Sequence, residues 1–173
     1  MLFAASTLYC VPFFLLMLLL PYWRPTRRIV RHDATFAPLA LAYLFLLAHS
    51  WQPDTWSLIL PGSFAEGFTG GFKVQFLPTL EGIMLLFSRL TTAASLWVHL
   101  LAINLFAART AFLQGLEHGI PFRHSVVLCA AFGPLGMVSH LLTRAFWRKR
   151  RDQGVAMSSR DGTLIIMPYG QET

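Results

Sequence analysis

Residues 97–143 decide the fold, and they read WVHLLAINLFAARTAFLQGLEHGIPFRHSVVLCAAFGPLGMVSHLLT. This stretch holds most of one apolar segment, residues 93–112, and all of a second, residues 125–143. Each segment has the length of about 20 residues that an α-helix needs to cross a bilayer. Polar side chains interrupt both segments, namely His99, Asn104 and His140. Such groups are costly inside a membrane, so they usually have a partner or a function.

The composition of the whole chain predicts the same class of fold. Of its 173 residues, 55% are hydrophobic and 13% are charged, and the mean hydropathy is +0.54. A soluble domain typically has about 25% charged residues. Because the charge is too low for a water-facing surface, we expect an all-α polytopic membrane protein with one domain.

Two more apolar runs raise the predicted number of transmembrane helices to four. Residues 2–20 end at an aromatic and basic exit that is typical of the membrane interface. A signal peptide is the alternative, but no basic residue precedes the run and no Ala-x-Ala site follows it. Residues 36–48 form a shorter run that needs its flanking residues to span. A buried core helix is the alternative there, with little soluble sequence to cover it.

The remaining segments complete the predicted organisation. Residues 51–78 are rich in glycine and proline, and aromatic rings recur at every fourth position: Phe64, Phe68, Phe72 and Phe76. We expect this loop to contact the headgroup layer. Residues 79–89 carry an apolar stripe that predicts a short interfacial helix before the third span. The predicted transmembrane domain covers residues 1–147, and a basic, mostly mobile tail covers residues 148–173.

Residues within the apolar segments are candidates for binding a lipophilic substrate. The proline of the sequence Gly133-Pro134-Leu135-Gly136 predicts a kink in the fourth span, where the glycines permit close approach of a backbone or flat ligand. The candidate substrate-binding residues are therefore His99, Asn104, Gly133, Pro134, Gly136 and His140. For the histidines and the asparagine, an interhelical hydrogen bond is the alternative role. His99 and Asn104 are five residues apart, so they point in different directions.

The polar turn between the segments supplies candidate catalytic residues. A histidine beside arginine and glutamate can transfer protons near neutral pH. The candidates are Arg109, Glu117, Arg123 and His124, and a solvated turn is the alternative. The sequence has no recognised catalytic signature. We expect no metal site, because the histidine spacings match none of the standard ones.

The basic residues form two clusters, around residues 24–31 and 148–151, in a chain of net charge +6. Four spans would place these clusters on opposite sides, so the positive-inside rule predicts no orientation. Binding to anionic headgroups is favoured over nucleic-acid binding, because the chain has no soluble domain to hold a duplex.

Residues 97–109 resemble the signature of the plastid neoxanthin-synthase family, the abscisic-acid-deficient type of membrane protein. Residues 123–129, 132–136 and 139–140 resemble it as well, and the likeness extends over residues 8–145. The resemblance implies a multi-pass protein of the thylakoid or inner envelope that converts violaxanthin to neoxanthin. One departure is Asn104, where the family pattern has an aspartate, because asparagine cannot act as a carboxylate base.

The implied reaction is an isomerisation, in which an acid protonates the epoxide oxygen and a base removes a proton from the adjoining polyene carbon. No cofactor is expected, although a bound carotenoid, chlorophyll or lipid is compatible with the sequence. Expected partners are the carotenoid substrate, membrane lipids, and a helper enzyme or photosynthetic complex. The alternative function is a non-catalytic, pigment-binding accessory subunit of a photosynthetic complex. A transporter is disfavoured by the few intramembrane charges.

Overall fold

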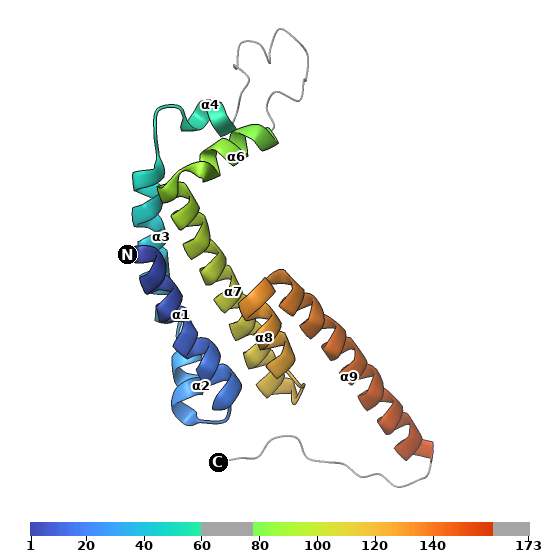
Figure 1. Cartoon of the computed structure of the whole chain (residues 1–173). Helices are drawn as coiled ribbons and strands as arrows, with labels where there is room; N and C mark the ends of the chain where they lie inside the picture. Colours follow the sequence, from blue (N-terminus) through green and yellow to red (C-terminus); the bar gives the residue numbers. More distant parts are fainter. Residues whose placement is uncertain (60–77, 161–173) are drawn as a thin grey trace.

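The computed structural model describes residues 1–59 and 78–160, with side chains placed through Arg151. All regular secondary structure in these ranges is helical (Figure 1). In chain order the elements are α1 (Leu2–Leu19), α2 (Arg24–Arg31), the 3-10 turn η1 (Asp33–Phe36), α3 (Ala37–Ser50), α4 (Thr55–Ile59), α6 (Leu80–Ser88), α7 (Leu90–His118), α8 (Arg123–Phe132) and α9 (Pro134–Arg160). The four phenylalanines expected to contact headgroups and the end of the basic tail lie outside the described residues.

Three long apolar helices form a frame with α7 at its centre. Leu2–Leu19, Asp33–Ser50 and Leu90–His118 are each long and apolar enough to cross a membrane. The structure therefore confirms the all-α class and supports three of the predicted spans. α7 packs against both of the other long helices. α1 lies alongside it in the same direction, and α3 runs the opposite way (Figure 1).

Side-chain contacts fix the register of this frame. The indole Nε1 of Trp97 on α7 donates to Thr7 Oγ1 on α1 at 2.9 Å. On the α3 side, the ring of Phe36 meets that of Phe106 at 6.0 Å between centroids. Small side chains along α7 let its neighbours approach closely; the fully or almost fully buried ones include Ala107, Ala108 and Ala111.

Two arginine–aspartate pairs bracket the apolar part of α7. Arg89 pairs with Asp54 at one end. Arg109 contacts Asp33 Oδ1 at 2.7 Å and donates to the carbonyl oxygen of Arg31 at 2.6 Å. The 20 residues between the arginines rise roughly 30 Å, at 1.5 Å per residue. That length equals the hydrocarbon thickness of a typical bilayer. The part of α7 between the two ion pairs is therefore just long enough to cross the hydrocarbon core, and the helix continues beyond Arg109.

The predicted fourth span is the main departure from expectation. We predicted one kinked helix over residues 125–143, but the chain ends α8 at Phe132 and starts α9 at Pro134. Gly133 between them has φ +49°, in the region that a residue without a Cβ adopts at little cost. Proline suits the first position of α9, where its missing N–H would have had no partner. The Gly-Pro pair therefore reverses the chain.

α8 and α9 pack against each other as a helical hairpin. A hydrogen bond of 2.9 Å joins His124 Nε2 and Thr143 Oγ1, 19 residues apart. Nearer the tip, a Cβ added to Gly136 would lie 2.3 Å from the backbone nitrogen of Cys129. A larger residue at this position would push the helices apart. α8 has only 10 residues, too few to cross a bilayer.

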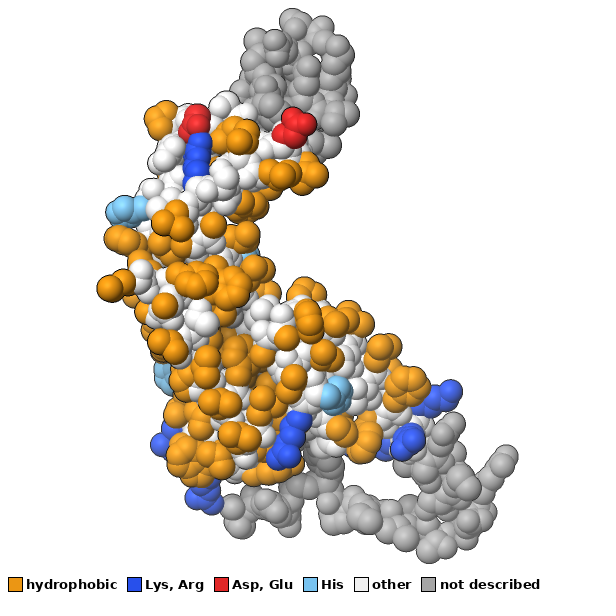
Figure 2. Space-filling view, viewed as in Figure 1, with side chains coloured by type: hydrophobic (Ala, Val, Ile, Leu, Met, Phe, Trp, Pro, Cys, Tyr) orange, Lys and Arg blue, Asp and Glu red, His pale blue; other side chains and the backbone are white. Residues whose placement is uncertain are grey.

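The hairpin brings both basic clusters to the same end of the molecule. α9 returns along the last turns of α7, where Arg144 Nη1 lies 3.5 Å from Gln114 Oε1. Further on, Arg151 Nη2 donates to the carbonyl oxygen of His118 at 3.2 Å. The expectation that the clusters lie on opposite sides is therefore wrong. Figure 2 shows lysines and arginines around this basic end, acidic side chains at the other end, and a mainly hydrophobic surface between.

The two ends are covered by short helices. At the basic end, α2 buries Thr26 and Val30 and exposes its arginines. At the opposite end, α6 confirms the predicted short helix, and its N-cap Thr79 accepts a 3.2 Å hydrogen bond from the backbone N–H of Gly82. α9 continues as a helix to Arg160, past the predicted domain boundary at residue 147.

Candidate functional site

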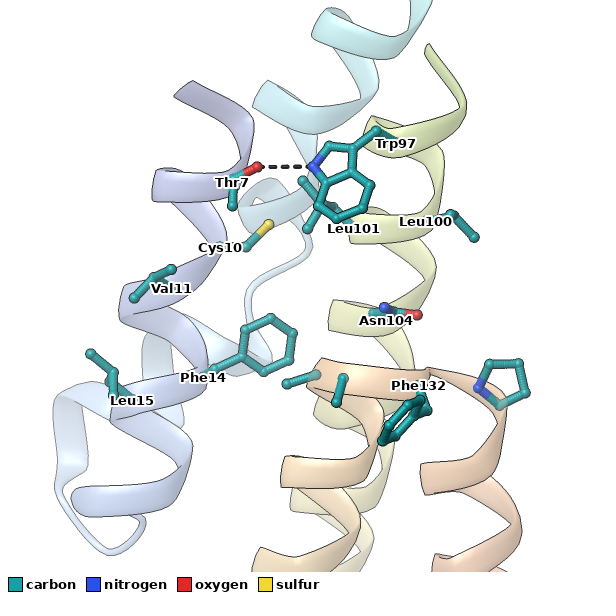
Figure 3. A pocket seen from close by; sticks show the side chains of 13 residues that line it. Thr7, Cys10, Val11, Phe14, Leu15, Trp97, Leu100, Leu101, Asn104 and Phe132 are labelled. Atoms are coloured by element: carbon teal, nitrogen blue, oxygen red, sulfur yellow. Dashed lines mark hydrogen bonds between the residues drawn. The ribbon is translucent and has the colours of Figure 1, made fainter. Parts of the chain in front are cut away.

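A cavity of about 550 Å³ lies where the tip of the α8–α9 hairpin meets α1 and α7. Figure 3 shows its lining side chains, which come from all of these helices. We call it the tip cavity, and it is lined chiefly by Cys10, Phe14, Leu101, Asn104, Phe132 and Pro134. Its wall is mostly apolar, and no charged side chain lines it within the described chain. It is therefore suited to an apolar molecule.

Asn104 provides the main polar group of the tip cavity. A Cβ added to Gly133 would lie 2.1 Å from Asn104 Oδ1, so the amide rests directly on the hairpin turn. The other polar contact in the cavity, from Trp97 to Thr7, is satisfied within the protein, as the dashed line in Figure 3 marks. A primary amide can both donate and accept hydrogen bonds. The cavity thus offers a single adaptable polar group to an oxygen atom of a lipophilic ligand.

The structure separates the predicted substrate-binding residues. Asn104 and Pro134 line the tip cavity, and Gly133 contacts Asn104. Gly136 instead lies in the helix contact within the hairpin. His99 faces the opposite side of α7, where its ring lies 5.4 Å from that of Tyr43 on α3. The different directions of His99 and Asn104 agree with their five-residue spacing.

His140 lies inside the hairpin. It is fully buried, and neither ring nitrogen has a hydrogen-bond partner among the described residues. The hydroxyl of Ser125 is buried as well, and it has no partner in the part of the chain that the structure describes. On α8, Ser125 lies four residues before Cys129, and on α9, His140 lies four residues after Gly136. Helical register therefore places both Ser125 and His140 about one turn from the contact between Cys129 and Gly136.

The environment of His140 favours its neutral form. α9 is not among the three candidate spans. Burial lowers the pKa of His140, and the positive charges of Arg144, His124 and His118 act in the same direction. A neutral imidazole offers one hydrogen-bond donor and one acceptor. His140 can thus bind a polar group or a water molecule without a cost of burying charge.

A second cavity of about 410 Å³ opens at the basic end. We call it the basic-end cavity, and its lining includes Tyr22, Gly119, Phe122, Arg123, His124 and Trp147. Arg123 and His124 are both exposed at the start of α8. The bond between His124 and Thr143 fixes the imidazole, because Thr143 Oγ1 in turn donates to the carbonyl oxygen of Ser139 at 2.9 Å. The hydroxyl proton is used there, so the ring nitrogen of His124 donates to Thr143.

The predicted catalytic residues divide into separate environments. Arg123 and His124 line the basic-end cavity together. Glu117 lies in the last turn of α7, with its Oε2 4.0 Å from His118 Nδ1. Arg109 is held elsewhere by Asp33, and its guanidinium lies 5.4 Å from the centre of the Phe36 ring. Arg109 therefore ties α7 to the η1 turn.

Asp33 is the residue that sequence reasoning missed. Its only signal was that it is the sole acidic residue before Asp54. A single carboxylate among many arginines near a membrane edge indicates a specific ion pair, but the sequence does not identify which arginine it contacts. The fold selects Arg109, 76 positions later in the chain.

The two cavities lie along one face of α8. Ala130 and Ala131 line the tip cavity, and Arg123 and His124 line the basic-end cavity. Ala130 lies seven residues after Arg123, and Ala131 lies seven residues after His124. Seven residues are nearly two full helical turns, so the members of each pair share a face about 10 Å apart. A long molecule lying along this face would reach both cavities.

The sequence pattern of the ABA DEFICIENT 4-like family matches residues 1–140. The chain belongs to the ABA DEFICIENT 4-like family. "Protein ABA DEFICIENT 4, chloroplastic" from Arabidopsis thaliana is 38% identical over 143 residues, which cover 83% of this chain and 60% of that relative. The chain thus spans about 60% of the length of the curated relative. No solved structure matches the chain.

The match over residues 1–140 confirms the family resemblance that is carried by residues 97–109, 123–129, 132–136 and 139–140. The region shared with the ABA DEFICIENT 4-like family includes the three long helices, α8 and the start of α9. It contains every residue that lines the tip cavity, and all those of the basic-end cavity except Trp147. Both cavities are therefore built from the part of the chain that defines the family.

Proposed function

We propose that this chain acts in carotenoid biosynthesis in a plastid membrane, where it isomerises the epoxide end of violaxanthin to the allenic end of neoxanthin. The name of the Arabidopsis relative supports a plastid location and a role in the abscisic acid pathway. The three helices that are long and apolar enough to cross a bilayer support a multi-pass membrane protein, and we propose the thylakoid or inner envelope as its membrane.

The observation that carries the proposal is the alignment of the tip cavity and the basic-end cavity along one face of α8. Violaxanthin is a long apolar polyene with an oxygenated ring at each end. The polyene fits the apolar wall of the tip cavity, with Asn104 as its polar neighbour. An epoxide ring directed toward the basic end would then lie near Arg123 and His124.

The reaction needs proton transfer and no change of oxidation state. A proton is added to the epoxide oxygen as its carbon–oxygen bond breaks, and a proton leaves the adjoining polyene carbon to form the allene. A histidine side chain can serve as such a donor or acceptor. We assign proton transfer to His124, oriented by Thr143, and stabilisation of the developing oxygen charge to Arg123. No cofactor is required by this stoichiometry.

The other two predicted catalytic residues have different roles in this proposal. Glu117, in the last turn of α7 beside the basic-end cavity residues Leu116 and Gly119, is the carboxylate assigned to remove the carbon-bound proton. Arg109 is assigned a positioning role, because its contacts with Asp33 and Arg31 hold η1 and α2 against α7.

The second candidate function is a non-catalytic, pigment-binding subunit of a photosynthetic complex. It is favoured by the chemistry of the tip cavity, whose described lining has neither a histidine nor a carboxylate. Such a cavity would hold a carotenoid, a chlorophyll tail or a lipid without changing it. A helper enzyme or a larger complex would then perform the reaction.

The test is a conversion assay with matched histidine variants. Protein purified in mild detergent is incubated with violaxanthin, alone and with plastid membrane extract, and the pigments are separated by chromatography. His124→Ala is expected to slow neoxanthin formation about 100-fold, the lower range for loss of a general acid or base. His32→Ala, at an exposed histidine outside the tip cavity and the basic-end cavity, is expected to retain the wild-type rate.

The outcomes separate the two candidates. Stoichiometric bound pigment without any turnover, even with extract present, would favour the accessory subunit. Neoxanthin formation at the wild-type rate by a stable His124→Ala protein would remove His124 from the mechanism.

A further inference from the structure

A third cavity lies on the other side of α7, near the end opposite the basic clusters. It has a volume of about 300 Å³ and is enclosed by α3, α4, α6 and α7. We call it the cap cavity. Hydroxyl and imidazole groups are concentrated in its lining, which includes Tyr43, Ser50, Thr55, Thr92, Ser95 and His99. None of its lining residues in the described chain is charged.

The cap cavity is roofed by two short helices. Thr55 and Ile59 come from α4, and Leu86 and Phe87 come from α6. The helices touch at Gly82, where an added Cβ would lie 2.2 Å from the carbonyl oxygen of Leu58. The Arg89–Asp54 ion pair connects the start of α7 to the loop before α4. The opposite charges of Arg89 and Asp54 cancel, so the cavity beneath this pair is polar but has no net charge.

Several polar groups of the cap cavity are available to a ligand. Thr92 is buried, and its Oγ1 has no hydrogen-bond partner among the described residues. Ser95 Oγ donates to the carbonyl oxygen of Thr92 at 2.8 Å, which leaves its lone pairs free to accept. The ring centroid of His99 lies 5.4 Å from that of Tyr43, and both side chains line the cavity. Buried polar atoms without partners are rare unless water or a ligand satisfies them.

The depth of these groups limits the kind of ligand. Measured along α7 from Arg89, Thr92 lies roughly 4.5 Å and His99 roughly 15 Å toward the membrane centre. Charged groups are costly at such depths. A neutral hydroxyl on an apolar ring can accept from His99 or donate to Thr92 and Ser95, while the apolar part packs against Leu86 and Phe87.

We propose that the cap cavity is a second ligand site, distinct from the tip cavity, for the hydroxylated ring of a neutral, membrane-dissolved molecule such as a hydroxycarotenoid. The two sites are on different sides of α7, as His99 and Asn104 show. The site needs neither the basic-end cavity nor the isomerase activity. Its ligand is recognised through the hydroxyl group rather than through polyene length.

The experiment compares two carotenoids that differ in their ring hydroxyls. Purified protein in detergent is titrated with zeaxanthin, which has a hydroxyl on each ring, and with β-carotene, the hydrocarbon with the same polyene. Bound pigment is measured by absorbance after size exclusion. The wild-type protein is expected to bind zeaxanthin at least tenfold more tightly than β-carotene.

The variants locate the hydroxyl contact. Thr92→Val with Ser95→Ala removes two hydroxyl groups, and His99→Phe keeps a ring against Tyr43 but removes both nitrogens. Each is expected to abolish the preference for zeaxanthin while β-carotene binding is unchanged, which also shows that the variant is folded. Thr110→Val, a matched threonine change outside all three cavities, is expected to keep the preference.

Three results would overturn the proposal. These are equal binding of both pigments by the wild-type protein, survival of the preference in both variants, and loss of the preference in Asn104→Leu alone, which would move the hydroxyl site to the tip cavity. None of these results depends on neoxanthin formation, which tests the proposed isomerase through His124. Failure of one proposal is therefore distinguishable from failure of the other.

Discussion

The three-helix frame and the α8–α9 hairpin have similar apolar sequences but follow different paths. In the frame, each apolar run becomes one long helix, and Leu2–Leu19, Asp33–Ser50 and Leu90–His118 can each cross a bilayer. In the hairpin, an apolar run of comparable length folds back on itself at Gly133. Hydropathy thus identifies residues that tolerate a membrane, whereas the Gly133-Pro134 pair decides where this run turns.

The sharpest test of this difference is the side of the membrane on which each basic cluster lies. Single cysteines at Arg28 and Arg150 are expected to react with a membrane-impermeant thiol reagent from the same side, and a cysteine at Glu81 from the other side. Each cysteine is expected to be labelled from one side of the membrane and not at all from the other. The native thiols, Cys10 and Cys129, are buried and provide the unlabelled background.

A continuous fourth span makes the opposite prediction for this experiment. It would place Arg28 and Arg150 on different sides, because one more crossing separates them. Labelling in sealed vesicles and again after detergent lysis controls for intrinsic reactivity. Protection of Arg150→Cys under conditions that label Arg28→Cys would contradict the hairpin.

The next largest effect is expected from filling the contact within the hairpin. Gly136→Leu places a side chain where even a Cβ would lie 2.3 Å from the Cys129 backbone. Overpacking of this kind typically costs about 1–3 kcal/mol and sometimes more, so the melting temperature in detergent should fall by several degrees.

Gly119→Ala is the matched control for that substitution. Gly119 has φ +63°, but an added Cβ would meet nothing within 4 Å. Its cost is limited to backbone strain of about 1–2 kcal/mol. A Gly136→Leu protein that is as stable as the wild type would show that close packing at Gly136 is not what holds the hairpin together.

The sequence predicted the frame well because its signals are local. Continuous apolar runs and the amphipathic stripe of α6 predicted the helices α1, α3 and α6 within about two residues at each end. For α7 they predicted residues 93–112, whereas the helix begins at Leu90 and continues to His118, through residues that were interpreted as part of a polar turn. The amphipathic helix α2 was missed, although its buried Thr26 and Val30 are four residues apart. The four arginines of this segment were interpreted only as a basic cluster that binds anionic headgroups, and not as part of a helix.

The hairpin was mispredicted because Gly-Pro has two physical outcomes. Proline after glycine can kink a helix or begin a new one, and both remove the same backbone hydrogen bond. The choice depends on whether a surface exists for α9 to pack on, and Gly136 against Cys129 provides it. The candidate site was affected in turn, since Asn104 and Pro134 meet in one cavity only when the chain reverses. Long-range partners such as Asp33 and Arg109 have no local signal at all.

The smallest predicted effect concerns His140, which lies where the hairpin helices meet. Because burial lowers the pKa of His140 in the folded protein, the unfolded chain binds a proton there that the folded chain does not. Stability is therefore lost as the pH falls below about 6.5, the ordinary value for histidine. His140→Leu is expected to remove this part of the pH dependence, measured as melting temperature between pH 5.5 and 7.5.

The same substitution tests whether the buried imidazole is kept for structure or for function. An unpartnered polar group costs stability, so His140→Leu is expected to be as stable as the wild type at pH 7.5 or slightly more stable. His32→Gln, at an exposed histidine outside the hairpin, should leave the pH dependence unchanged. Parallel pH profiles for His140→Leu and wild type would mean that the pKa of His140 is the same in the folded and unfolded proteins, which would contradict the prediction. A His140→Leu protein that is more stable but no longer binds or converts violaxanthin would mean that the imidazole serves the ligand. The hairpin would then differ from the frame in keeping a side chain that costs stability for the sake of function.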